Sequence, residues 1–189
     1  MKAKPFRPAD VQGNILRGYR RQRIRHLVLE VADPRAARRW IGGTVSGDGG
    51  LQVTTESPAR WTEKPPLCFN LGATFAGLAA LGVPPASLAG FPDEFREGMT
   101  ARAVKLGDVG ASAPDQWEAP FATPERVHLI ATCHADDVAT LDAATAEVVA
   151  AGGTRAFRLA GTRDGWNFNG DFVHFGYRDN ISQPRFEGI

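Results

Sequence analysis

Two strand–helix–strand patterns, one near each end of the chain, constrain its fold more than any other feature. In the first, residues 24–31 (IRHLVLEV) are aliphatic and β-branched, which predicts a buried strand. Asp33 followed by Pro34 is typical of a helix start, and we expect a short helix that the glycine pair Gly42 and Gly43 ends. The residues that this helix would bury are Ala37, Trp40 and Ile41.

The second pattern lies in the last third of the chain. Residues 126–133 (RVHLIATC) predict a strand, and Asp136 is expected to cap the helix that follows. A glycine pair at Gly152 and Gly153 would end this helix, and residues 154–160 predict the next strand. Three- and four-residue spacing places one set of residues on a single helical face: Val138, Leu141, Thr145 and Val148.

Two further strands are expected between these patterns, at residues 51–55 and 67–71. Residues 84–120 are rich in Gly, Pro and Asp, but they carry too many large apolar side chains for a disordered linker. We therefore expect a long ordered excursion with one helical piece around residues 91–99. The whole pattern predicts an α+β domain, a ferredoxin-like sandwich with helices on one face of a mostly antiparallel sheet. No glycine-rich phosphate loop follows the first strand, which argues against a doubly wound sheet.

Charge and cysteine content exclude several classes of protein. The 189 residues include 22 basic and 21 acidic side chains, which gives no electrostatic reason to expect nucleic acid or a membrane surface as a partner. Arginines cluster at positions 17–25, and we interpret them as a solvated approach to the first strand. Cys68 and Cys133 lie in apolar runs, so we expect buried free thiols. With no signal peptide and no stretch long enough to span a membrane, the predicted location is cytoplasmic.

The C-terminal residues 171–184 contain the most informative motif. An apolar alternation there breaks into a turn of Gly, Asp and Asn residues, and Asp179 lies in the turn. An aspartate at such a break is either a turn former bonded to a nearby backbone amide or a carboxylate that projects from the strand end into a pocket. The residues alone leave both interpretations open.

Residues 176–180 (GYRDN) resemble the Gly-x-x-Asp-Gly signature of the DyP-type (dye-decolorizing) haem peroxidases, and residues 181–184 (ISQP) match the sequence that commonly continues it. Asn180 stands where that family has glycine, and Asn is the best non-glycine residue for a left-handed turn. Further blocks resemble the same family in the same order along the chain: residues 11–19, 70–78, 95–108 and 114–117.

The resemblance implies half of the two-domain DyP fold, in which two ferredoxin-like domains hold haem b mainly through the C-terminal one. Asp179 would be the catalytic acid and base that moves a proton between the two peroxide oxygens. The proximal histidine and the distal arginine of the family would lie outside this chain, so no residue here is expected to bind iron. The residues expected beside the cofactor are Asp179, Asn180, Ile181, Ser182 and Gln183.

Two other residues near the signature have simpler interpretations. His174 shares an alternating run with Phe172, so we interpret it as a sheet histidine satisfied by hydrogen bonds rather than as an iron ligand. Tyr177 is a candidate radical relay to bulky donors, although core packing is the commoner role of an aromatic side chain.

We expect an N-terminal arm at residues 1–22, a ferredoxin-like domain at 23–175 with its excursion at about 84–120, and a distal-loop segment at 176–189.

Three hypotheses for the function follow. In the first hypothesis the chain is the distal-acid half of an enzyme that acts on hydrogen peroxide and an aromatic reductant. It would then need a C-terminal peroxidase domain or a second subunit. In the second hypothesis it is a haem-free assembly or binding module. In the third, two copies pair through their sheet faces as a homo-oligomer and hold haem between them. Absence of the second half should leave apolar surface exposed, so we expect some form of association.

Overall fold

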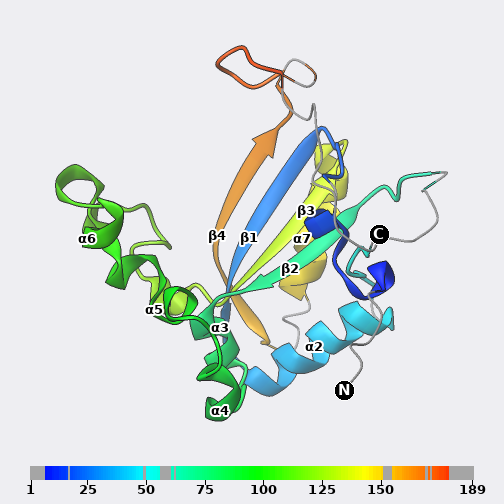
Figure 1. The fold of residues 1–189 in the computed structure, drawn as a ribbon. Coiled ribbons are helices and arrows are strands. Elements are labelled where there is room, and N and C mark those ends of the chain that lie inside the picture. The colour runs from blue at the N-terminus through cyan, green and yellow to red at the C-terminus, as the bar shows by residue number, and fades with distance from the viewer. Residues whose placement is uncertain are drawn as a thin grey trace.

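Four antiparallel strands form a single sheet in the order β2-β3-β1-β4 (Figure 1). The computed structural model describes residues 7–16, 18–48, 50–55, 61, 63–150, 155–168, 170 and 172–178. The strands are β1 (Arg23–Val31), β2 (Cys68–Ala73), β3 (Leu129–Ala135) and β4 (Phe157–Trp166).

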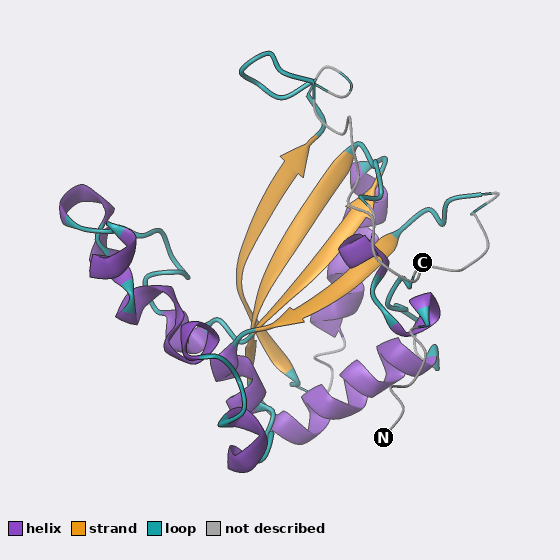
Figure 2. Cartoon of the chain, in the orientation of Figure 1, coloured by secondary structure: helices purple, strands orange, loops and turns teal. Residues whose placement is uncertain are grey.

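Each of the two long helices connects two strands that are not neighbours in the sheet. Helix α2 (Pro34–Ser46) lies between β1 and β2 in the sequence, and α7 (Val138–Ala150) lies between β3 and β4. In the sheet, β3 separates β1 from β2, and β1 separates β3 from β4. This is the predicted ferredoxin-like α+β arrangement, and Figure 2 shows α2 and α7 beside the sheet.

The remaining helices are short. Most belong to the excursion between β2 and β3, and 3-10 turns connect them (Figure 1). The α-helices are α1 (Gly13–Leu16), α3 (Phe75–Ala80), α4 (Pro85–Leu88), α5 (Asp93–Ala101) and α6 (Ala103–Leu106), and the 3-10 turns are Pro8–Asp10, Gly110–Ser112, Pro114–Gln116 and Pro124–Arg126. None of the helices in the described ranges is long and apolar enough to cross a lipid bilayer.

The hydrophobic core lies between the sheet and helices α2 and α7. Strand β3 shows the expected alternation, with every second residue buried. Its buried side chains face those of β1 and the inner side of α7. The largest fully buried core residues are Leu27, Leu29, Phe69, Leu141 and Val148.

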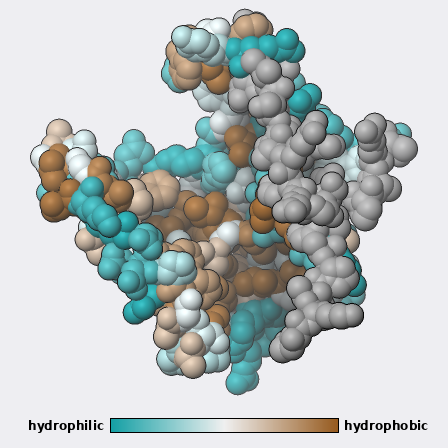
Figure 3. Space-filling model, in the orientation of Figure 1, coloured by the Kyte–Doolittle hydropathy of each residue, from teal (hydrophilic) through white to brown (hydrophobic). Residues whose placement is uncertain are grey.

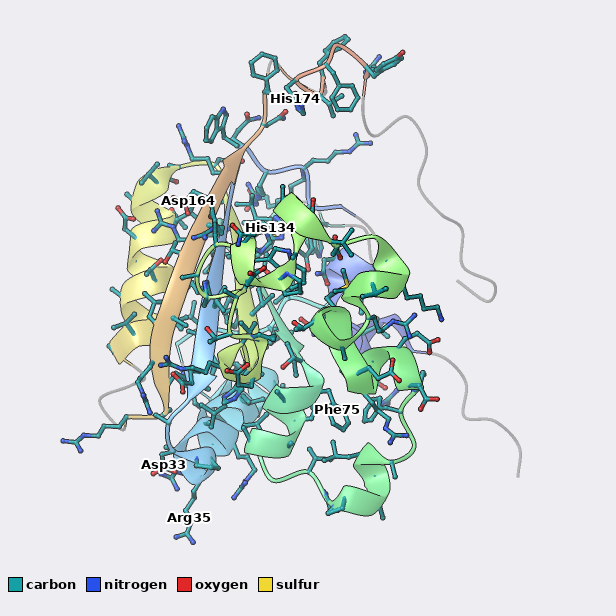
Figure 4. The ribbon with its side chains drawn as sticks, turned by 90° about the vertical axis from the view of Figure 1, so that its left-hand side faces the viewer. Asp33, Arg35, Phe75, His134, Asp164 and His174 are labelled. Carbon is teal, nitrogen blue, oxygen red and sulfur yellow. The ribbon has the colours of Figure 1, made fainter. Side chains whose placement is uncertain are left out.

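The other side of the sheet, which we call the second face, carries the residues that alternate with the core. Strand register places His26 opposite Thr132 and Ile24 opposite His134, so these four side chains share this face. All four are half-buried. Figure 4 shows α7 on one side of the sheet and the helices of the excursion on the other.

The first helix is longer than the sequence predicts. Helix α2 continues through Gly42 and Gly43 to Ser46 and ends at Gly47. Gly47 has a φ of 80°, in the left-handed region that favours glycine, and its N–H donates to the carbonyl of Gly43 at 3.0 Å. The predicted stop at the glycine pair was wrong because glycine weakens a helix without ending it unless its backbone turns. The predicted N-cap is confirmed, since the Asp33 carboxylate accepts from the backbone N–H groups of Arg35 and Ala36.

Two strand predictions also need correction. Residues 51–55 form no strand, and Thr55 makes only an isolated bridge to Gln12. Strand β4 continues from Phe157 to Trp166, beyond the predicted end at residue 160, because it pairs with β1 along its whole length. A bulge opposite Val28 and Leu29 lets this pairing continue.

Helix α7 starts with a different residue from the one predicted. Asp137 accepts a hydrogen bond from the backbone N–H of Thr140 at 2.7 Å, as a cap does. Asp136 instead accepts from the backbone N–H of Gln22 at 3.1 Å and pairs with Arg21. Tertiary contacts to the N-terminal segment have thus taken Asp136 out of the cap position. The predicted helix end at Gly152 and Gly153 lies outside the described residues.

The excursion is more helical than the single predicted piece. Helix α5 is kinked at Gly98, whose backbone has a φ of 70°. Phe75 and Phe95 pack edge to face with ring centres 6.2 Å apart, which joins α5 to α3. Figure 3 shows apolar residues among hydrophilic ones on this arm. The exposed large apolar side chains of the arm are Phe91, Phe95, Met99, Val104, Leu106 and Val109.

Candidate functional site

The predicted catalytic signature begins in a hairpin that follows β4. The predicted site residues Asp179, Asn180, Ile181, Ser182 and Gln183 lie outside the described residues, and their roles stay predictions. The structure describes residues 172–178, which lead directly to Asp179.

The hairpin is closed by backbone contacts. Phe172 and Arg178 form an isolated antiparallel bridge, and the N–H of Val173 donates to the carbonyl of Tyr177 at 2.9 Å. Gly176 turns the chain with a φ of 92°, and its N–H donates to the carbonyl of Val173 at 2.9 Å. A side chain is strained at such a φ, so the first glycine of the signature is required by the turn.

Aromatic side chains project from this hairpin into solvent. Phe175 is 65% exposed and Tyr177 is 73% exposed, and their ring centres lie 5.8 Å apart. His174 is also exposed, and its ring packs edge to face with that of Phe175, with ring centres 4.8 Å apart. The interpretation of His174 as a sheet histidine was wrong, because β4 ends at Trp166 and His174 lies in a turn at the far end of the molecule (Figure 4).

An open cleft of about 710 Å³ lies at the same end of the sheet. It is bounded by residues 18–24, at the start of β1, by His134, and by residues 165–168 and 172–174, at and beyond the end of β4. Its volume is in the range typical of small-molecule sites, roughly 300–1,000 Å³. The side chains around it are aromatic, basic or apolar, and none of its described lining residues is acidic.

Tyr19 forms one wall of the cleft. Its ring is 4% exposed, stacks on Trp61 at 5.8 Å and meets the edge of His134 at 5.1 Å. Its hydroxyl lies 3.4 Å from the carbonyl of Thr54. A Cβ at Gly13 would lie 2.9 Å from that hydroxyl, so glycine leaves room for the ring. These contacts hold the N-terminal segment against the sheet.

Two histidines on the second face are held in their neutral form. Burial lowers the pKa of His134 to about 4, and the nearby His26 lowers it further. Burial also lowers the pKa of His26, whose Nδ1 is 3.0 Å from the hydroxyl of Thr132. Neither belongs to a metal site, since the described part of the chain brings no three His, Cys, Asp or Glu side chains together as ligands.

Arg21 is a largely buried cation in the lining of the cleft. Its side chain is 8% exposed and pairs with Asp136 at 2.5 Å, and it also donates to the carbonyl of Pro65. The thiol of Cys68 lies beside it, and burial raises the pKa of that thiol although the Arg21 charge opposes the shift. Cys68 and Cys133 are both buried and free, as predicted.

Sequence reasoning missed the residues of this cleft. Tyr19 and His134 are 115 positions apart in the sequence, and only the fold brings them together. Two signals were present, because Tyr19 ends a block that resembles the DyP family and Arg21 and Arg23 belong to the early arginine cluster. The cluster was interpreted as solvated, whereas Arg21 is buried and Arg23 borders the cleft.

Two peroxidases are similar to this chain in sequence. The chain is 27% identical to Peroxidase 2 of Mycetinis scorodonius over 184 residues, covering 95% of the chain and 34% of that protein. It is 30% identical to the multifunctional dye peroxidase DyP2 of Amycolatopsis sp. over 191 residues, covering 94% of the chain and 38% of that protein. The chain thus spans little more than a third of the length of these relatives.

Solved structures of dye-decolorizing peroxidases share the fold of this chain. A dye-decolorizing peroxidase in complex with 2,6-dimethoxyphenol superposes with a TM-score of 0.76 at 27% identity, covering 95% of this chain and 39% of that one. The decolorizing peroxidase of Auricularia auricula-judae shares the fold, with a TM-score of 0.80 at 20% identity over 97% of this chain and 39% of that one. Residues 10–160 match the profile of the family described as the DyP dimeric alpha+beta barrel domain. The chain therefore belongs to the DyP family and contains its N-terminal α+β barrel domain.

Proposed function

We propose that this chain is the distal-acid half of a haem-dependent peroxidase that reduces hydrogen peroxide and oxidises dyes or phenolic donors. Family membership supports the class of activity, and both relatives are named as peroxidases. A C-terminal domain, or a second subunit, would supply the iron ligand. Asp179 would be the catalytic residue of this half.

One structural observation carries the proposal. Gly176, the first glycine of the signature, occupies the left-handed turn of a hairpin that projects beyond the sheet, three residues before Asp179. Such a hairpin can present the carboxylate to a neighbouring domain instead of the core of its own domain. A carboxylate suits this role because, with an ordinary pKa near 3.9, it remains a base at pH values where a histidine would be charged.

The side chains near the hairpin are compatible with haem b. A porphyrin is planar and largely apolar with an acidic edge, and the rings of Phe172, Phe175 and Tyr177 are exposed around the hairpin. When bound, haem supplies the redox chemistry of the peroxidase. Asp179 would accept a proton from one peroxide oxygen and return it to the other. The residues proposed beside the cofactor are Asn180, Ile181, Ser182 and Gln183.

We assign the second face of the sheet to contact with another domain or subunit. Ile24, His26, Ile130 and Thr132 are half-buried there, and a packed layer of another domain would cover them. We propose the C-terminal peroxidase domain as that layer, with a second copy of this chain as the alternative. We also propose domain limits at residues 23–175 and 176–189. We propose a cytoplasmic location as well, which the two free thiols support.

Haem absorbance separates the enzyme from a haem-free module. We expect the protein that contains this chain together with its second domain to show a Soret band and to oxidise a phenolic donor with hydrogen peroxide. We expect the chain alone to hold haemin weakly. A two-domain protein that is colourless and does not respond to haemin would instead identify a haem-free assembly module.

A further inference from the structure

We propose that a second cleft, between helices α2 and α7, is a binding site for a zwitterionic ligand, namely an α-amino acid with an apolar side chain. Arg39 would bind the carboxylate of this ligand, Glu147 its ammonium group and Trp40 its side chain. The cleft lies on the helical side of the sheet, opposite the second face, so binding there requires neither haem nor another domain. The inference therefore goes beyond the proposed peroxidase function.

The α2–α7 cleft is large enough for such a molecule. Its volume is about 480 Å³, within the range typical of small-molecule sites, roughly 300–1,000 Å³. Residues of α2 form one wall, residues of α7 form the other, and the loop after α2 contributes the rest. The cleft is therefore built from three segments of this chain.

Two opposite charges line the cleft without pairing with each other. Neither the carboxylate of Glu147 nor the guanidinium of Arg39 makes a hydrogen bond or an ion pair with the residues that the structure describes. Arg39 interacts electrostatically with Asp33, but that carboxylate already accepts two backbone N–H groups at the start of α2. Asp48, the other acid of the lining, accepts from the hydroxyl of Ser46 at 2.7 Å. A ligand that carries both an ammonium group and a carboxylate would pair the two open charges.

Trp40 provides the apolar wall of the cleft. Its side chain is half-buried, and its ring packs edge to face with Phe69 and Phe157, with ring centres 6.1 Å and 5.2 Å apart. Because these contacts already fix the ring, it loses little side-chain freedom when a ligand packs on it. An apolar ligand side chain would bury its surface there.

Two glycines keep the cleft open. Gly43 lies inside α2, where glycine weakens a helix, and it lines the cleft with no heavy atom within 4 Å of the position that a Cβ would take. Gly50 leaves room for the Glu147 carboxylate, which a Cβ there would overlap. Gly42 also lies inside α2, but it is exposed and does not line the cleft. A large side chain should therefore fill the cleft at Gly43 and extend into solvent at Gly42.

Calorimetric titration of the chain with L-phenylalanine tests the proposal. We expect one molecule bound per chain, with an affinity about three- to tenfold weaker in Glu147→Gln and in Arg39→Gln. Phenethylamine, which lacks the carboxylate, and hydrocinnamate, which lacks the ammonium group, should each bind about three- to tenfold more weakly than L-phenylalanine. The matched control for Arg39 is Arg35→Gln, which removes an exposed arginine that does not line the cleft and should change the affinity less than about twofold.

A second pair of variants tests the cleft itself. Gly43→Leu should weaken the binding of L-phenylalanine by at least about tenfold, because the added side chain occupies the space of the ligand. Gly42→Leu places the same side chain one position earlier in α2 and should leave the affinity within about twofold of the native value. Far-ultraviolet circular dichroism checks that both variants keep the native fold.

Each outcome decides the proposal. Binding that weakens in Glu147→Gln, Arg39→Gln and Gly43→Leu but not in the two controls supports it. No binding at millimolar L-phenylalanine, or native affinity in a folded Gly43→Leu variant, would overturn it. Phenethylamine that binds as tightly as L-phenylalanine would also overturn it and indicate a site for organic cations, and hydrocinnamate that binds as tightly would remove the role of Glu147. Because no haem or peroxide is present, the result is independent of whether the two-domain protein is a peroxidase.

Discussion

Arg25 on β1 clamps Asp164 on the edge strand β4 with two parallel hydrogen bonds, from Nε at 2.7 Å and from Nη2 at 2.8 Å. The same guanidinium donates to Asp142 on α7 at 2.7 Å and to the hydroxyl of Thr145 at 3.1 Å. One side chain that is only 12% exposed thus joins two strands and the helix beneath them. Bidentate pairs of this kind are stronger than ordinary surface ion pairs.

Replacing Arg25 should therefore weaken the whole domain. We expect Arg25→Met to lower the free energy of unfolding by about 1–3 kcal/mol, because the hydrogen bonds to charged groups are lost while both carboxylates still reach water. Urea denaturation at pH 7 measures this. The Arg158→Met variant, which alters an exposed arginine at the other end of β4, should change stability by no more than about 0.5 kcal/mol.

The same pair gives a pH dependence. The hydrogen bond from Arg25 lowers the pKa of Asp164 below its ordinary value of 3.8. A carboxyl whose pKa is depressed in the folded state stabilises the fold above its unfolded pKa, and that contribution is lost as the pH falls through the folded pKa. We expect Asp164→Asn to lose less stability than the native chain between pH 5 and about pH 2. Identical pH profiles for the two proteins would contradict this.

His134 becomes positively charged when it is protonated, and it should change the stability of the fold in a different pH range. Burial lowers its pKa from 6.5 to about 4, so the unfolded chain binds the proton more tightly than the folded one between these values. Stability should fall as the pH drops from 6.5 to 4, by roughly 1–2 kcal/mol after allowance for partial solvent exposure. His134→Phe keeps a ring against Tyr19 and should remove this loss. Urea midpoints at pH 7 and pH 4.5 give the comparison.

Some features of this fold could be predicted from the sequence, and others could not. The β1 and β3 strands, the helices after them and the antiparallel α+β class follow from local periodicity, and the structure confirms them. The end of α2 could not be predicted, because it depends on the backbone of Gly47 rather than on the presence of glycine at position 42. Asp136 and Asp137 look alike in sequence, and only the approach of Gln22 decides which of them caps α7.

The candidate site, too, could be predicted from the sequence only in part. The signature from residue 176 could be found from its spacing, whereas the positive φ of its first glycine is known only from the structure. Tyr19 and His134 could not be paired without the fold, because their contact depends on β3 lying next to the start of β1. Residues 51–55 have the composition of a strand but do not form one, since Thr54 bonds the edge of β2 only at Phe69 and the side chain of Gln12 takes the backbone groups of Leu71.

Gly77 is a position where a single methyl group should disturb the fold. A Cβ there would lie 1.9 Å from the carbonyl oxygen of His128, which accepts a hydrogen bond from the backbone N–H of Thr74 before α3. We expect Gly77→Ala to cost about 2–3 kcal/mol of unfolding free energy, because backbone must move to admit it. Gly72→Ala is the matched control, since no heavy atom lies within 4 Å of its added Cβ. Thermal midpoints that fall equally in both variants would disprove the packing argument.

The two thiols should be inert in the folded chain. Burial raises the pKa of Cys133 to about 11 and also raises that of Cys68, and both side chains are fully buried. Because the thiolate is the reactive form, we expect Ellman's reagent at pH 8 to modify neither thiol within minutes in the native protein and both of them in guanidinium chloride. Fast reaction of one thiol in the native state would show that the sheet opens near it.

The proton transfer assigned to Asp179 can be measured most directly by stopped-flow mixing of the haem-loaded, two-domain protein with hydrogen peroxide. In Asp179→Asn we predict an unchanged Soret band before mixing and a reaction with peroxide slower by about 10²–10⁴-fold, the usual contribution of a positioned acid and base. A rate within about threefold of the native protein, with haem equally bound, would show that this carboxyl group does not take part in the reaction.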